Sequence, residues 1–217
     1  MSTEMIPSVI DYLLQLPEAM HFAKVHELCS DGISSYRMLS DYGSGTFQLI
    51  EFENNLLLIL IGDYKPKDTF EKITEISEDY MEISQFETDS SSFKIGGRKR
   101  NQVDKGIYCY LNTQKKTYTY CEGGKVVRFT KVILSPQYFQ TYFKLHDENN
   151  ARLLSSARDY LLKNPNLPEL NFVFQQIRDC QAEGTTLKLY LESKVTSFSG
   201  CKRNRTGAKT YFCKTGL

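Results

Sequence analysis

The sequence predicts a mainly β protein with C-terminal helices, an α+β fold in which an antiparallel β-barrel or jelly roll precedes a helical segment. The first observation is a series of at least seven short apolar runs between residues 42 and 134, most of them at hairpin spacing. The second is that no helical period separates these runs, so a parallel sheet would lack its crossover helices. The third is the return of three-and-four periodicity from residue 149. With 217 residues and 41% hydrophobic content, the chain can bury a core.

Residues 1–41 are expected to form an N-terminal helical segment. Pro7 suits the first position of a helix, and Ile10, Leu13 and Leu14 give a short apolar face before Pro17. A further turn or two is expected through the stretch EAMHFAKVHELC.

Residues 42–147 are expected to form the β domain. The runs GTFQLIEF and NLLLILIG are separated by ENN, a pattern typical of a hairpin, and further runs follow as far as KVVRFTKVILS. The intervening stretches GGRKRNQVDKG, TQKK and EGG have turn-forming or loop-forming compositions.

Residues 148–200 are expected to form helices that mediate a homodimer. Apolar residues recur along one side of PELNFVFQQIRDC, and again along TTLKLYLESKV beyond the break at Gly184. Helices packed on one side of a barrel leave more apolar surface than one barrel face can cover, and a symmetric partner would bury the rest. The predicted dimer interface comprises Leu170, Phe174, Ile177, Leu187, Leu191 and Val195.

The last residues, 201–217, differ from the rest of the chain in charge and pattern. They hold five basic residues and no acidic one, which leaves 22 basic and 26 acidic residues in positions 1–200. The body therefore has no excess of positive charge for binding nucleic acid by itself. We expect this basic tail to be disordered or non-native, either out-of-frame sequence or a genuine short extension.

Residues for catalysis and metal binding are scarce, so we predict no catalytic residues, no metal and no cofactor. The three histidines, His21, His26 and His146, lie outside the predicted strands and in no metal-ligand spacing. The six cysteines form no CxxC pair and are expected to be buried reduced thiols. The sequence has no signal-peptide pattern and no apolar run of about 18 residues, so we expect a cytoplasmic protein with no membrane partner.

Two features nominate ligand-binding residues. If Leu111 pairs with Thr117 in one hairpin, four tyrosines share a sheet surface, either as ordinary cross-strand packing or as the aromatic wall of a small-molecule pocket. The GGRKR loop supplies two arginines to an anionic ligand, or is only solvated. The candidate ligand-binding residues are Tyr108, Tyr110, Tyr118, Tyr120, Arg98 and Arg100.

The segment SPQYFQTYFK, followed by NPNLPELNFVFQQIRDCQAEGTTLKLYLESKV, resembles the effector domain of AraC/XylS-type bacterial transcription regulators. The shared pattern is a Ser-Pro-x-Tyr/Phe step after the strands, a Gln-Gln-Ile-Arg-like helix face, and a Gly before Leu-Tyr-x-Glu-Ser-Lys-Val. The resemblance is strongest over residues 131–195 and extends only to strand order over residues 42–130.

The resemblance implies a cupin-like barrel that senses a small-molecule effector or mediates dimerisation. DNA would be bound only through a C-terminal helix-turn-helix domain, for which nothing after Gly200 has the pattern, so we favour truncation before that domain. A cupin enzyme is less favoured, because no histidine lies on a predicted strand to hold a metal. A metal-free binding or scaffold module is the remaining alternative.

Overall fold

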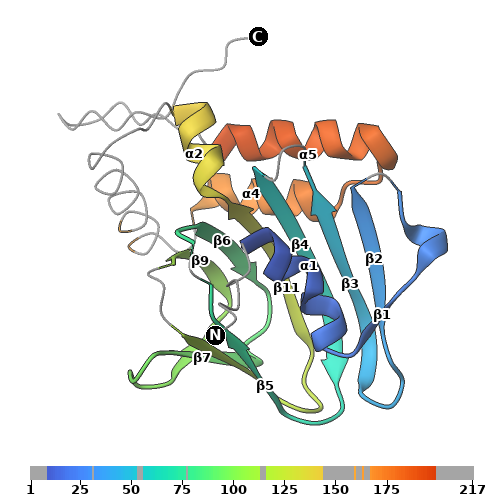
Figure 1. Cartoon of the computed structure of the whole chain (residues 1–217), viewed down its shortest axis with the longest axis vertical. Coiled ribbons are helices and arrows are strands. Elements are labelled where there is room, and N and C mark those ends of the chain that lie inside the picture. The colour runs from blue at the N-terminus through green and yellow to red at the C-terminus, as the bar shows by residue number, and fades with distance from the viewer. Residues whose placement is uncertain are drawn as a thin grey trace, which may run out of the picture.

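The structure is a computed structural model that describes residues 9–143 and 167–198, apart from 31, 53–55, 77 and 113–115, together with residues 159 and 163. The described strands form two antiparallel sheets (Figure 1). The large sheet has the order β1 (Phe22–Lys24), β2 (Ile33–Met38), β3 (Gly43–Glu51), β4 (Leu57–Pro66), β11 (Val127–Leu134), β6 (Met81–Phe86), β9 (Gly106–Leu111). The small sheet has the order β5 (Phe70–Thr74), β10 (Thr117–Cys121), β7 (Ser91–Ile95), β8 (Asn101–Val103).

The eight strands from β4 to β11 follow the order of a jelly roll. Four of them, β4-β11-β6-β9, belong to the large sheet, and the other four, β5-β10-β7-β8, form the small sheet. From β4 to β7, and again from β8 to β11, successive strands therefore alternate between the two sheets. Two interlocked Greek keys require this alternation. The predicted fold class, mainly β with C-terminal helices, is confirmed, with two facing sheets rather than one closed barrel.

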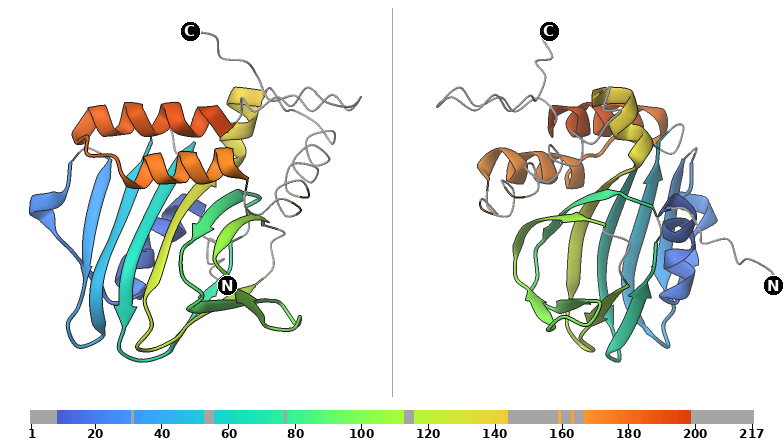
Figure 2. Two further views of the ribbon diagram at one scale, coloured as in Figure 1. Left: turned by 180° about the vertical axis from the view of Figure 1, so that it is seen from behind. Right: turned by 60° about the vertical axis from the view of Figure 1, so that its left-hand side comes forward.

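Helices cover the parts of the large sheet that the small sheet leaves open (Figures 1 and 2). Helix α1 (Val9–Ala19) lies on the same side as the small sheet and packs beside Phe22 and Phe47. Helices α4 (Pro168–Arg178) and α5 (Gly184–Phe198) lie across the opposite face. Helix α2 (Pro136–Phe143) follows β11, and a short helical turn, η1, spans His26–Leu28. The large sheet thus separates two apolar clusters.

The cluster beneath α4 and α5 changes the interpretation of the predicted dimer interface. All six nominated residues are buried in the single chain, with Phe174 and Leu191 0% exposed. They pack against Ile59, Ile83 and Val132 of the large sheet. Their spacing correctly marked one apolar side of each helix. Strands β1 to β3 widen the sheet, so that the sheet itself covers the apolar sides of both helices. Leu170, Phe174, Ile177, Leu187, Leu191 and Val195 are therefore core residues, and their assignment to an exposed interface was wrong.

The N-terminal segment also differs from its prediction. Within residues 1–41 the described α-helix ends at Ala19, and β1 and β2 then join the edge of the large sheet. Pairing with β3 overrides the weak local pattern of ISSYRM, whose burial does not alternate regularly. The tail 201–217 and His146 lie outside the described residues.

Candidate functional site

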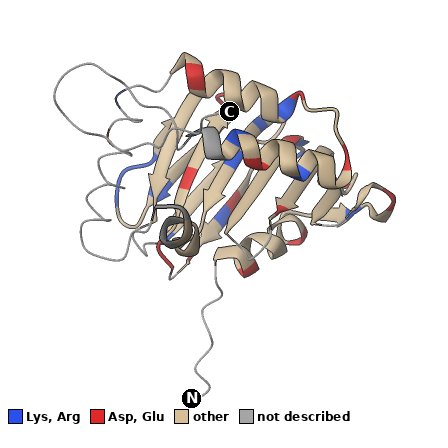
Figure 3. Ribbon diagram, turned by 90° about the horizontal axis from the view of Figure 1, so that it is seen from above, with Lys and Arg blue, Asp and Glu red and all other residues tan. Residues whose placement is uncertain are grey.

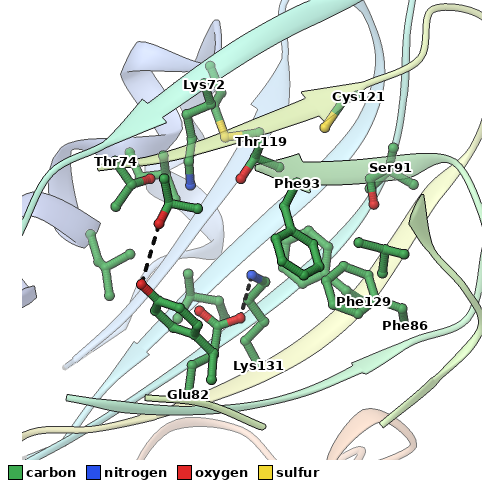
Figure 4. A pocket seen from close by; sticks show the side chains of 18 of the residues that line it. Lys72, Thr74, Glu82, Phe86, Ser91, Phe93, Thr119, Cys121, Phe129 and Lys131 are labelled. Atoms are coloured by element: carbon green, nitrogen blue, oxygen red, sulfur yellow. Dashed lines mark hydrogen bonds and ion pairs between the residues drawn. The ribbon is translucent and has the colours of Figure 1, made fainter. Parts of the chain in front are cut away.

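A cavity of about 150 Å³ lies between the two sheets of the jelly roll (Figure 4). Strand alternation decides which side chains reach it, because every second residue of each strand points between the sheets. Leu13, Leu16 and Met20, on or just beyond α1, close one side. The cavity therefore uses residues from both sheets and from the N-terminal helix.

One wall carries a partly buried ion pair on adjacent strands. Lys131 Nζ of β11 lies 2.6 Å from Glu82 Oε1 of β6, and the Ser84 hydroxyl donates to the same carboxylate at 2.5 Å. Burial alone would raise the pKa of Glu82, but Lys131, Ser84 and Lys72 together hold that pKa below its usual value. Lys131 Nζ also lies 5.4 Å from the ring centroids of both Phe86 and Phe129. This lysine is neutralised and fixed in place.

A second lysine enters the cavity from the opposite wall. Lys72 of β5 extends between the sheets toward the Glu82 and Lys131 side (Figure 4). No hydrogen bond or ion pair joins its ammonium to any residue that the structure describes. Burial, and after it the repulsion from Lys131, lowers the pKa of Lys72 to about 8. The cavity thus holds an ammonium group that lacks a bonded counterion.

Hydroxyl and aromatic groups complete the lining. Thr119 lies opposite Lys72 on the neighbouring strand, and both face the cavity. The Tyr110 hydroxyl bonds to Asn112 Oδ1 at 3.2 Å and lies 3.3 Å from Thr117 Oγ1. Ser91 Oγ is buried and has no hydrogen-bond partner among the described residues. The apolar side chains that line the cavity include Phe70, Phe86, Phe93 and Phe129.

The predicted four-tyrosine surface is divided between two places. Tyr108 and Tyr110 line the cavity, whereas Tyr118 and Tyr120 do not. The assumed pairing of Leu111 with Thr117 is wrong, because β9 pairs with β6 while β10 pairs with β5 and β7. In a jelly roll these two consecutive strands belong to different sheets, so the short connection between them is not a hairpin.

Of the two predicted arginines, one lies against an outward-facing tyrosine. The guanidinium carbon of Arg100 is 4.0 Å from the Tyr120 ring centroid, and its Nε donates to Ser92 Oγ at 2.5 Å. Lys94 Nζ similarly lies 5.6 Å from the Tyr118 ring centroid. Arg98 is exposed and takes part in the turn after β7 through its backbone N–H. The six nominated residues therefore do not form one site.

The sequence interpretation missed Lys72, Glu82 and Lys131. A usable signal was present in FEKIT, where Lys72 shares a strand face with Phe70 and Thr74, and in VRFTKVIL, where Lys131 shares one with Phe129 and Ile133. A lysine on the apolar face of a strand is uncommon and marks a site where charge is needed.

The described residues do not form a metal site, a membrane-spanning helix or a patch of one charge along α4 and α5. No three His, Cys, Asp or Glu side chains of this part of the chain lie close enough to hold a metal ion. None of its helices combines the length and the apolarity needed to cross a membrane. Along α4 and α5, seen from above in Figure 3, acidic and basic residues intermix instead of forming a patch of one sign.

Comparison with known proteins gives one family match. The model of the regulatory protein PchR N-terminal domain matches residues 45–198. Sequence comparison with curated proteins finds no match.

Solved structures give only distant likenesses. The Schizosaccharomyces pombe Cnp3 cupin domain is similar at 8% identity and a TM-score of 0.36, over 48% of this chain and 74% of that one. Ectoine synthase from P. lautus follows at 10% identity and 0.34, over 50% and 75% of the two chains. An HTH_3 family transcriptional regulator from Vibrio cholerae has 8% identity and 0.32, over 42% and 51%.

The family match covers most of the chain. It begins in β3 and ends with α5, so it includes both helices on the far side of the sheet and all of the cavity lining except Leu13, Leu16 and Met20. It also includes residues 131–195, on which the resemblance to a regulatory effector domain rested. The chain belongs to the family of the regulatory protein PchR N-terminal domain.

Proposed function

We propose that this domain senses a small molecule in the cavity between its sheets and passes the signal to a DNA-binding unit, as an effector domain of an AraC-type transcriptional regulator. The observation that carries the proposal is the interior ammonium of Lys72, which has no bonded counterion, in a domain of a regulatory family. A buried charge without a partner destabilises a fold, so its presence favours a binding role. We propose a non-enzymatic, cytoplasmic protein.

Strand β6 offers a physical connection from the cavity to the helices. Its Glu82 lines the cavity and accepts a hydrogen bond from Ser84, while Gln85 Nε2 donates to Asn171 Oδ1 of α4 at 2.9 Å. Beyond the strand end, Glu87 forms an ion pair with Arg178 of the same helix. A ligand that displaces Glu82 would shift β6 and so bias the position of α4.

We further propose that the outer side of α4 and α5 forms a homodimer contact. Phe172 and Leu189 are 60% and 63% exposed there. An open groove lined by Phe172, Cys180 and Tyr190, among others, lies between the helices. Two symmetric copies would bury these apolar groups. In this proposal DNA is contacted through a helix-turn-helix domain and not through the part of the chain that the structure describes.

The test of sensing is a search for saturable ligands of the cavity. We would screen a chemically diverse set of small fragments by saturation-transfer NMR against the native domain and a Thr119→Phe variant, whose added ring fills the cavity from β10. The proposal expects fragments that bind the native domain and lose binding in Thr119→Phe, while Lys94→Gln on the outer face leaves binding unchanged. If no fragment is sensitive to Thr119→Phe, a scaffold that acts through other proteins becomes the better explanation.

A further inference from the structure

We propose that the cavity recognises a small organic acid, with one carboxylate that pairs with Lys72 and a compact apolar body that packs against the phenylalanines of the opposite wall. This inference rests on the proposed function and adds the chemical class of the ligand. Three observations carry it: the charge balance of the cavity, its volume, and the arrangement of its lining.

The charge balance leaves one positive charge uncompensated. Of the ionisable groups that line the cavity, Glu82 and Lys131 neutralise each other at 2.6 Å. Burial raises the pKa of Cys121, and that of the tyrosines Tyr80 and Tyr110, so these groups stay neutral at pH 7. Lys72 is still mostly protonated at that pH, since its pKa is about 8. A ligand that carries a single negative charge therefore complements the cavity.

The volume limits the ligand to a compact body. An apolar cavity of about 150 Å³ is known to accept a ring of about six carbon atoms. The cavity here has a similar volume of about 150 Å³. One six-membered ring with a single carboxylate fits this space, whereas a nucleotide or a peptide does not.

The lining separates the two ends of such a ligand. Lys72 and Thr119 lie opposite each other on β5 and β10, so an ammonium and a hydroxyl donor can reach the two oxygens of one carboxylate. Phe86 and Phe129 line the wall beside Lys131, on the large sheet opposite Lys72, and Phe93 lies beside Thr119 on the small sheet (Figure 4). A phosphate monoester is a poorer match, because its second negative charge would lie beside these rings without a counterion.

The experiment compares three probes of one shape that differ in charge. Isothermal titration calorimetry at pH 7 would measure cyclohexanecarboxylate, its neutral amide and the cationic aminomethylcyclohexane against the native domain. We expect the acid to bind at least about tenfold more tightly than the amide, since a charged hydrogen bond is replaced by a neutral one, and the amine not to bind.

Two matched lysine variants assign the preference to a residue. Lys72→Gln should reduce the difference between acid and amide to within about twofold. Lys94→Gln removes a lysine from the outer face of the same small sheet and should leave the preference intact. If Lys72→Gln does not fold, Lys72→Met replaces it, and the comparison of acid with amide on the native domain stands without any variant.

The outcomes separate this inference from the proposed function. If the amide binds the native domain as tightly as the acid, or if Lys72→Gln keeps the preference, the ligand class is wrong although the cavity is still a binding site. The same conclusion holds if none of the three probes binds while other fragments bind and are lost in Thr119→Phe. If Thr119→Phe changes no binding at all, both proposals fail.

Discussion

The two faces of the large sheet bury side chains of different chemistry. On the face toward α4 and α5, Ile59, Ile83, Val132 and Leu134 pack against apolar helix residues. On the face toward the small sheet, the same strands present Glu82, Lys131 and a cavity of about 150 Å³. A sheet that only needed a core would be filled on both sides, because close packing is favourable. The difference is that the face toward α4 and α5 is closely packed, whereas the other face combines an apolar cluster with a charged cavity, which supports the proposed binding role.

The largest effect is expected from a charge placed on the face of the sheet that packs against α4 and α5. Leu191→Lys should cost about 4 kcal/mol or more and prevent folding, because Leu191 is 0% exposed and no described acidic group lies in its cluster. Circular dichroism and thermal unfolding would measure this effect. Leu189→Lys, two residues along the same helix and 63% exposed, should change stability by no more than about 0.5 kcal/mol. Equal losses in the two variants would contradict the placement of α5.

A smaller loss is expected on the cavity face. Lys131→Met should destabilise the domain by up to about 3 kcal/mol at pH 7, because Glu82 loses its bonded partner and keeps only the more distant Lys72. Urea unfolding would measure the cost. The cost should begin to shrink above the usual Glu value of 4.5, because burial raises the pKa of Glu82 once Lys131 is gone, and it should shrink further below 4.5, where the native pair is lost as well. The control is Lys116→Met, which breaks an exposed pair with Glu75 and should cost less than about 1 kcal/mol.

Replacing Lys72, which has no bonded counterion, should change stability in the opposite direction from Lys131→Met. Without ligand, Lys72→Met should stabilise the domain by about 1–3 kcal/mol at pH 7, since it removes a buried charge whose pKa is lowered from 10.5 to about 8. The unfolded chain binds more protons than the folded one between these two values, so native stability rises there with pH. The advantage of Lys72→Met should therefore be complete below pH 8 and disappear toward pH 10.5. A variant less stable than the native domain at pH 7 would mean that Lys72 has a bonded partner.

The smallest effect on stability is expected on the outer side of the helices. Phe172→Lys should leave unfolding almost unchanged, because this ring is 60% exposed. If the proposed dimer forms there, light scattering should show the native chain at twice its mass of 25.0 kDa and the variant at 25.0 kDa. A native chain that remains a monomer at tens of micromolar would remove the dimer proposal without affecting the cavity.

The sequence predicted the class of the fold better than the site. Apolar periods located the strands and the helices α4 and α5, because burial on one face leaves a direct trace in the sequence. Periodicity does not show whether an apolar helix face packs against a sheet or against another subunit. Leu191 was therefore assigned to a dimer interface. Strand pairing depends on contacts between distant residues, so Leu111 was assigned a false partner in Thr117. The site was missed because its two lysines lie on strands β5 and β11, far apart in the sequence.

The position of β11 in the large sheet bears on when the domain becomes able to bind. This strand is the last of the jelly roll, and it inserts between β4 and β6, so Lys131 finds Leu60 and Ser84 as its cross-strand neighbours only after the whole β region is made. Contacts across such a long loop form slowly, because the entropy of the loop is lost before these contacts stabilise the fold. The two lysines therefore face each other across a common space only in the complete fold. A nascent or partly folded chain would have no such cavity, and a ligand of the kind proposed would bind and stabilise only completely folded molecules.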